Sequence, residues 1–302
     1  MIEPRHDHRP LRSGVVLHTV HWDPPAPDPE LPPWLLVHGL ASNARLWDGV
    51  ARHLARRGHR VVAVDQRGHG SSSKPDDGYD MGTVADDLLA VIEDLGWDGT
   101  QRPGVAGQSW GGNVAVELAF RHPDAVHTLA CVDGGFIDLG ARFPVWDDAA
   151  ATLAPPRLAG TPLEHVEQWI AASAADWPEE GRRGTLANFE VRADGTIAPW
   201  LTFDRHLTVL RGLWEHRPST RYPHIGVPTL LIAAATGDVS WTHSKRDAVD
   251  AAIAALPTGR AVWFDPAHHD VHAQRPVEVG DLLHASMTDP TFFSPDRSEV
   301  AP

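Results

Sequence analysis

The stretch Gly107-Gln108-Ser109-Trp110-Gly111 constrains the fold of this chain more than any other. The short apolar run at residues 103–106 precedes it and predicts a buried strand, and residues 112–120 follow with apolar side chains at helical spacing. A strand that turns into a helix within one residue forces the corner residue into strained backbone angles, and the flanking glycines remove side chains that would collide there. The pattern therefore predicts that Ser109 stands at the carboxyl end of a sheet, facing a helix N-terminus.

Composition and charge narrow the class of protein. The chain has 302 residues, 42% of them apolar, which fits one large domain or a domain with a sizeable insertion. A net charge of −14 argues against nucleic acid or an anionic membrane as the main partner. The one cysteine, Cys131, rules out an internal disulfide and lies in an apolar run, where we expect a buried, inert thiol.

The beginning of the sequence shows no targeting segment. The first thirty residues are rich in Pro, His and Asp and lack the apolar stretch of a signal peptide. No run approaches the roughly 18 apolar residues that a membrane span needs. We therefore expect a soluble, cytoplasmic protein.

Buried strands alternate with amphipathic helices along most of the chain. We predict further strands at 14–20, 34–37, 60–64, 126–132, 229–233 and 260–264, and helices at 43–57, 83–95, 244–256 and 276–287. Residues 1–10 and 289–302 are polar and predict loose tails. This alternation predicts an α/β fold with a mostly parallel central sheet and helices on both faces.

The alternation is interrupted after the strand at 126–132. The interruption lacks sheet-like strands, carries five of the twelve tryptophans and contains helical patterns at 163–174 and 204–215. We therefore expect a core domain made of residues 1–135 and 223–302, with a helical cap, or lid, inserted at 136–222.

Later loops supply the groups that a reactive serine needs. A serine hydroxyl is nearly inert at neutral pH, so it requires a base, an acid that orients the base, and donors for an oxyanion. Asp238 follows the strand at 229–233, and His268 and His269 follow the last strand. Asp133, just past the strand at 126–132, is the alternative acid.

Three histidines, His268, His269 and His272, have a spacing that could also suit a metal. The sequence offers no matching second ligand cluster, and a serine with a base and an acid needs no metal. We therefore expect neither a metal nor a cofactor.

These pieces resemble the α/β-hydrolase superfamily over nearly the whole chain. The matching motifs are His38-Gly39-Leu40, Asp65-Gln66-Arg67-Gly68-His69-Gly70-Ser71, the elbow at 107–111, Gly237-Asp238, and His269 seven residues before Pro276. The resemblance implies a catalytic triad with Ser109 as nucleophile, His269 as general base and then acid, and Asp238 as the acid that orients His269. It also implies an oxyanion hole formed by the backbone N–H groups of Leu40 and Trp110, and no cofactor.

Several tryptophans suggest an apolar pocket over Ser109. The candidates are Trp146, Trp169, Trp200, Trp214 and Trp241, whose alternative role is to form the core of the cap. Such a pocket favours a bulky, uncharged acyl or alcohol group, so the partner that we expect is a hydrophobic small molecule.

We thus predict a serine esterase that cleaves carboxylic esters or lactones of hydrophobic small molecules through an acyl-enzyme. The same triad would also serve a carbon–carbon bond hydrolase, a peptidase like proline iminopeptidase or a perhydrolase, and a receptor-like member could bind a ligand without turnover. Epoxide hydrolases and haloalkane dehalogenases are disfavoured, because their family nucleophile is an aspartate and this chain has Ser109.

Overall fold

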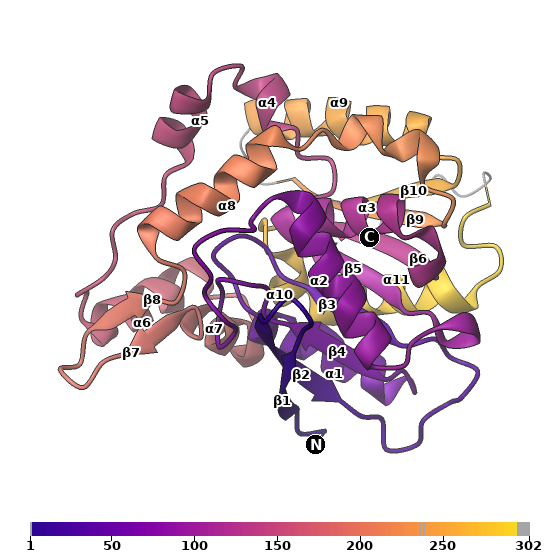
Figure 1. The fold of residues 1–302 in the computed structure, drawn as a ribbon, viewed down its shortest axis with the longest axis horizontal. Coiled ribbons are helices and arrows are strands. Elements are labelled where there is room, and N and C mark those ends of the chain that lie inside the picture. Colours follow the sequence, from indigo (N-terminus) through magenta and orange to yellow (C-terminus); the bar gives the residue numbers. More distant parts are fainter. Residues whose placement is uncertain (1, 236, 238, 295–302) are drawn as a thin grey trace.

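The computed structural model describes residues 2–235, 237 and 239–294. Within these residues, eight strands form one sheet in the order β1-β2-β4-β3-β5-β6-β9-β10 (Figure 1). The strands are β1 Arg5–Pro10, β2 Val16–Trp22, β3 Trp34–Val37, β4 Val61–Val64, β5 Gly104–Gln108, β6 Thr128–Val132, β9 Thr229–Ala234 and β10 Gly259–Phe264. The strands from β4 to β10 in that order are parallel, and β1 and β2 pair antiparallel. The predicted α/β class is confirmed.

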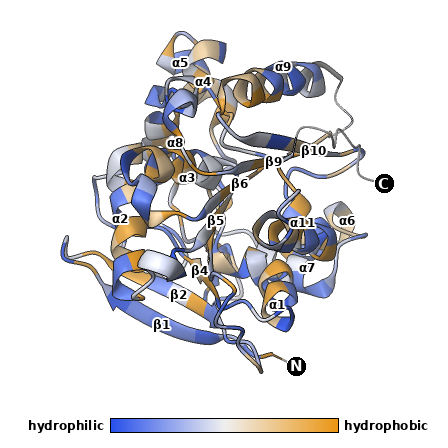
Figure 2. Ribbon diagram, turned by 90° about the vertical axis from the view of Figure 1, so that its right-hand side faces the viewer, coloured by the Kyte–Doolittle hydropathy of each residue, from blue (hydrophilic) through white to orange (hydrophobic). Residues whose placement is uncertain are grey.

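Helices cover both faces of the sheet, as Figure 2 shows with the sheet seen near its edge. On one face, α2 (Met81–Asp94), α3 (Trp110–Arg121) and α9 (Val239–Ala255) pack into one apolar cluster. On the other face, α1 (Asp48–Arg56) and α11 (Pro276–Thr288) pack into a second. Because its strands are buried on both faces, the sheet is built from continuous apolar runs such as the fully buried β3.

Short helical elements in the core and at the end of the segment that joins β6 to β9 add to these. They are η1 Ala44–Trp47, η2 Gly99–Gln101, η3 Pro123–Ala125, η4 Pro218–Thr220, η5 Tyr222–His224 and α10 Val271–Gln274. No helix in the described part of the chain is long and apolar enough to cross a membrane.

The first strand differs from the prediction of a loose tail. β1 pairs with β2 in register from Arg5 opposite His21 to Pro10 opposite Val16. None of its residues is buried, and the ring of the exposed His6 stacks on that of His18 with centroids 5.1 Å apart. An edge strand of this kind has no apolar alternation, so the sequence pattern gave no sign of it.

Residues 136–222, here called the insertion, connect β6 to β9. They form α4 Leu139–Arg142, α5 Trp146–Leu153, α6 Leu163–Ser173, α7 Glu179–Leu186, α8 Phe203–Glu215 and the hairpin of β7 Phe189–Val191 with β8 Ile197–Pro199. The helices predicted at 163–174 and 204–215 are present as α6 and α8. The hairpin was not predicted, because three-residue strands are too short to show an alternating pattern. Figure 1 shows α4, α5 and α8 along the upper left of the molecule and the hairpin at its lower left.

Candidate active site

Ser109 occupies a strained corner between β5 and α3, with φ 52° and ψ −123°. A Cβ added at Gly107 would lie 2.2 Å from the carbonyl oxygen of Gly111, and one added at Gly111 would lie 2.3 Å from that of His38. Both positions therefore need glycine. The corner that the sequence pattern predicts is present.

The two candidate oxyanion-hole residues flank this corner. Trp110 is the first residue of α3, where backbone N–H groups have no partner within the helix. Leu40 follows β3 and lines the same cavity as Ser109. The next residue, Ala41, has φ 61° and donates its N–H to His69 Nε2 at 3.3 Å, which fixes the loop that carries Leu40. The role of these two N–H groups stays a prediction.

His269 contacts a buried carboxylate. Its Nδ1 lies 2.6 Å from Oδ2 of Asp133, whose side chain is fully buried, whereas the side chain of His269 is 45% exposed. A carboxylate only accepts hydrogen bonds, so Nδ1 carries the proton and Nε2 keeps a free lone pair. Burial alone would lower the pKa of His269, but the hydrogen bond and charge of Asp133 outweigh it and raise that pKa.

Asp133 is held by three further contacts from neighbouring elements. The N–H of Ala234 donates to Oδ1 at 2.9 Å, and Lys245 Nζ lies 2.8 Å from each carboxylate oxygen. Burial favours the neutral acid, but His269, Lys245 and the Ala234 N–H together lower the pKa of Asp133. The carboxylate is therefore ionised at neutral pH.

A hydrogen bond from a side chain to the backbone joins the histidine loop to the serine corner. Gln108, the residue before Ser109, donates from Nε2 to the carbonyl oxygen of His269 at 3.4 Å. Ser109 and His269 line one cavity, but no hydrogen bond joins their side chains in the described residues. Such bonds often tighten only when substrate is bound.

Of the two predicted acids, Asp238 lies outside the described residues. Asp133, the alternative acid, has the carboxylate that contacts His269. Both aspartates follow a parallel strand, and β6 and β9 are neighbours in the sheet. The ends of both strands therefore lie near the histidine loop, which is why sequence position alone left the two acids open.

The other two histidines of this segment have different surroundings. The ring of His268 packs edge-on against Trp177 with centroids 4.9 Å apart. His272 is fully buried against Trp47, and burial lowers its pKa to about 3. Within residues 2–235, 237 and 239–294, no group of three or more His, Cys, Asp or Glu side chains is placed to hold a metal ion.

A cavity of about 860 Å³ lies over Ser109 between the core and the insertion. Its apolar walls are formed by Leu40, Phe136, Ile137, Leu139, Ala141, Leu153, Leu210, Leu213, Trp241 and Ala248. Its polar lining consists of Ser109, Asp133, Asp138, Arg142, His206, Ser244, Lys245 and His269. This volume is typical of a small-molecule site, and the wall is mostly apolar.

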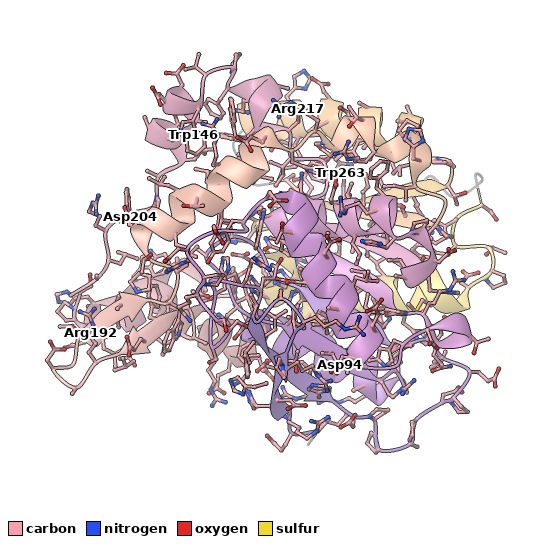
Figure 3. The ribbon with its side chains drawn as sticks, viewed as in Figure 1. Asp94, Trp146, Arg192, Asp204, Arg217 and Trp263 are labelled. Atoms are coloured by element: carbon pink, nitrogen blue, oxygen red, sulfur yellow. The ribbon has the colours of Figure 1, made fainter. Side chains whose placement is uncertain are left out.

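The tryptophan prediction was wrong for four of its five residues, since only Trp241 is among the residues that line this cavity. Trp146 and Trp214 pack against each other with centroids 5.9 Å apart; Trp146, on α5, is labelled in Figure 3. Trp169 is 55% exposed, and Trp200 faces the Lys74 ammonium. Trp146 and Trp214 thus pair within the insertion, Trp169 lies on its surface, and Trp200 meets the core at Lys74.

Leucines of α8 form much of the wall that tryptophans were expected to form. Leu210 and Leu213 face the cavity, and so does His206 one turn earlier. Burial lowers the pKa of His206 to about 4, so its ring is neutral at pH 7. The apolar spacing of α8 marks this face in the sequence, but the sequence does not tell whether the face meets a cavity or the core.

Comparison with known proteins shows the family. Residues 32–272 match the family model described as the alpha/beta hydrolase fold. Epoxide hydrolase A of Mycobacterium tuberculosis is 33% identical over an alignment of 334 positions, which covers 91% of this chain and 95% of that protein. The chain therefore belongs to the alpha/beta hydrolase fold family.

Other similar proteins share parts of the chain or its fold. Soluble epoxide hydrolase of Corynebacterium sp. (strain C12) is 37% identical over 115 residues, and the match spans 37% of this chain and 39% of the length of that relative. The crystal structure of E-2-(acetamidomethylene)succinate hydrolase superposes with a TM-score of 0.76 at 21% identity, over 95% of this chain and all of that one. The first match therefore covers only part of that relative, and the second shows a shared fold.

Proposed function

We propose that this protein is a serine hydrolase that cleaves carboxylic esters or lactones of hydrophobic small molecules through an acyl-enzyme. One observation carries the proposal. A strained serine and a histidine held by a buried carboxylate at 2.6 Å line the same mostly apolar cavity. We assign Ser109 as nucleophile, His269 as base and Asp133 as the acid.

The proposed reaction begins when Ser109 Oγ attacks the substrate carbonyl carbon while His269 Nε2 takes its proton. The N–H groups of Leu40 and Trp110 stabilise the oxyanion. His269 then gives its proton to the leaving alcohol. Water, deprotonated by His269, next attacks the acyl-enzyme, releases the acid and restores Ser109. Asp133 orients the ring and stabilises the imidazolium throughout.

The names of the relatives raise epoxide hydrolysis as a rival. An aspartate nucleophile opens an epoxide to give an ester, and water can cleave that ester at its carbonyl carbon. Attack by Ser109 would instead give an ether, which has no carbonyl for water to attack. The serine at the corner therefore favours acyl transfer over epoxide opening.

The walls of the cavity support an apolar substrate. Side chains such as Phe136, Leu139 and Leu213 leave few polar partners for a hydrophilic acyl chain. Burying each added methylene contributes about 0.8 kcal/mol. We therefore expect kcat/KM to rise with acyl length until the chain fills the cavity.

A graded substrate screen tests this function. Nitrophenyl esters from acetate to octanoate, lactones, an anilide and styrene oxide are assayed with the native enzyme and with Ser109→Ala. We expect turnover of esters or lactones, a preference for medium acyl chains, no turnover of styrene oxide, and no activity in Ser109→Ala. Epoxide turnover that persists in Ser109→Ala would contradict the proposal, as would a preference for acetate.

A further inference from the structure

Lys245 forms an ion pair with Asp133, the carboxylate that holds His269. Its Nζ lies 2.8 Å from each oxygen of Asp133 and 2.6 Å from the carbonyl oxygen of Ala234. An ammonium has three donors, and these three acceptors match them. The side chain is 15% exposed, so water screens the ion pair only partly. Oδ2 of Asp133 is therefore shared between Lys245 and His269.

We propose that Lys245 is a positioning residue that sets the pH range in which His269 acts as a base, by neutralising part of the Asp133 charge. A carboxylate with a histidine as its sole charged partner stabilises the imidazolium with its full charge. An ammonium on the same carboxylate opposes that effect. The imidazole therefore stays unprotonated to lower pH, and more of the enzyme holds a free base under mildly acidic conditions.

The contact also fixes the direction of the carboxylate. Asp133 is held at Oδ1 by the Ala234 N–H and at both oxygens by Lys245. The carboxylate group cannot rotate without breaking these bonds, so Oδ2 stays directed at the ring of His269. Lys245 thus acts through Asp133 and has no contact with the reacting atoms in this assignment.

The other titratable groups near His269 do not replace this effect. Asp270, the next residue, raises the pKa of His269, as Asp133 does, whereas burial and Lys245 lower it. His272 and His206 are neutral at pH 7, since burial lowers their pKa values to about 3 and about 4. His268 is half-exposed and lies 3.7 Å from Asp270. Lys245 is the ammonium that contacts the Asp133 carboxylate directly.

The kinetic test rests on the proposed function and compares pH profiles of kcat/KM. Lys245→Met removes charge and donors, Lys245→Gln removes the charge but keeps a donor, and Lys245→Arg keeps the charge. Arg246→Met is the matched control: it removes a charge from the next residue of α9, which lies 3.6 Å from Asp265 and stacks on Trp263. All variants are checked for folding by circular dichroism.

We expect the acidic limb of the profile to move up by about one pH unit in Lys245→Met and Lys245→Gln. It should stay in place in Lys245→Arg and Arg246→Met. In the Asp133→Asn background, Lys245→Met should produce no such shift, because the group through which it acts is gone. An equal loss of rate at every pH, with an unmoved limb, would overturn the proposal.

A second readout needs no turnover. The ring of His269 is titrated by NMR, and its signal is assigned by its loss in His269→Ala. The pKa of His269 should rise by about one unit in Lys245→Met and Lys245→Gln. Since this titration does not depend on a substrate, it separates failure of the lysine proposal from failure of the proposed function. An unchanged ring pKa in both variants would show that Lys245 merely supports the fold.

Discussion

Two buried aspartates of this molecule each contact a histidine, and the two histidines differ in their access to solvent. Asp65 follows β4 and lies 2.8 Å from Nδ1 of His18; Asp133 follows β6 and lies 2.6 Å from Nδ1 of His269. The side chain of His18 is 8% exposed, whereas that of His269 is 45% exposed and lines the cavity. An aspartate–histidine pair is thus not by itself an active site; access to a cavity and a serine at its edge make the second pair a candidate.

The remaining partners reinforce the difference. Asp65 also accepts hydrogen bonds from the N–H groups of Ala44 and Ser71, at 2.7 and 2.9 Å, and so joins β2, η1 and the loop after β4. Burial would raise its pKa, but His18, His38 and the Ala44 N–H lower it to about 2. The Asp65–His18 pair is buried and cannot reach a ligand. The ring of His269 lines the cavity, where its Nε2 is available to a ligand.

The two histidines should give the largest contrast. We expect His269→Ala to lower kcat/KM by roughly 10⁴-fold or more, because the base is lost. The unfolding free energy should change little, because the buried Asp133 carboxylate keeps its ion pair with Lys245 and its hydrogen bond from the Ala234 N–H. His18→Ala should retain the chemistry but lower the urea midpoint, since Asp65 loses a buried partner. Ester kinetics and urea unfolding on both variants check this. A fully active His269→Ala would show that another histidine is the base.

Substitution of the two carboxylates should show the same contrast, with Asp133 affecting the rate and Asp65 affecting stability. Asp133→Asn should reduce kcat about 10⁴-fold, the cost of losing the orienting acid in such triads. Asp65→Asn should instead destabilise the fold by about 3 kcal/mol, with the chemistry retained in the folded fraction. A mild effect of Asp133→Asn on kcat would show that Asp133 is not the acid that orients His269. Asp238→Asn, assayed in parallel, should then show the larger loss of kcat.

Acid should inactivate the enzyme before it removes the stability due to Asp65. The pKa of His269 is raised above its usual value of about 6.5 by the hydrogen bond and charge of Asp133, so the base is lost at a higher pH than in an unperturbed histidine. The lowered pKa of Asp65, about 2, means that its stabilisation is present above the unfolded value of about 3.9 and lost between these two values. Rates and unfolding free energies measured from pH 8 to pH 2 should show the two losses in that order.

Two exposed tryptophans, one lining the cavity and one outside it, test which side chains contact the substrate. Their substitution should have the smallest effects on activity among these variants. Trp241 is 42% exposed and lines the cavity, whereas Trp169 is 55% exposed and does not. Trp241→Ala should change the preference among acyl lengths several-fold, because part of the wall is lost. Trp169→Ala should leave that preference within about twofold. Equal effects of the two substitutions would argue that Trp241 does not contact the substrate.

Local patterns predicted the core of the molecule well. The elbow at Ser109 follows from glycines at fixed positions between a strand and a helix, and β3 has the predicted bounds. The place after the last strand left His268 and His269 as candidates for the base, and the resemblance to the α/β-hydrolase superfamily favoured His269 by its spacing to Pro276. These features depend on neighbours in the sequence, which a single chain reveals.

Features that depend on packing between distant segments could not be predicted in the same way. Asp133 and Asp238 have equivalent positions after neighbouring strands, so only three-dimensional contacts identify the partner of His269. The role of Lys245 depends on how α9 lies against the end of β6. The cavity wall depends on how the insertion folds over the core, and four of the five tryptophans proposed for it pack elsewhere.

The central claim is that Ser109 is made nucleophilic by the histidine that Asp133 holds. The most direct test treats the protein with a fluorophosphonate probe and measures the intact mass and the modified peptide, in the native protein and in His269→Ala. We expect a single adduct on Ser109 in the native protein and labelling slowed by orders of magnitude in His269→Ala. An unlabelled native protein, or equal labelling of the two, would contradict it.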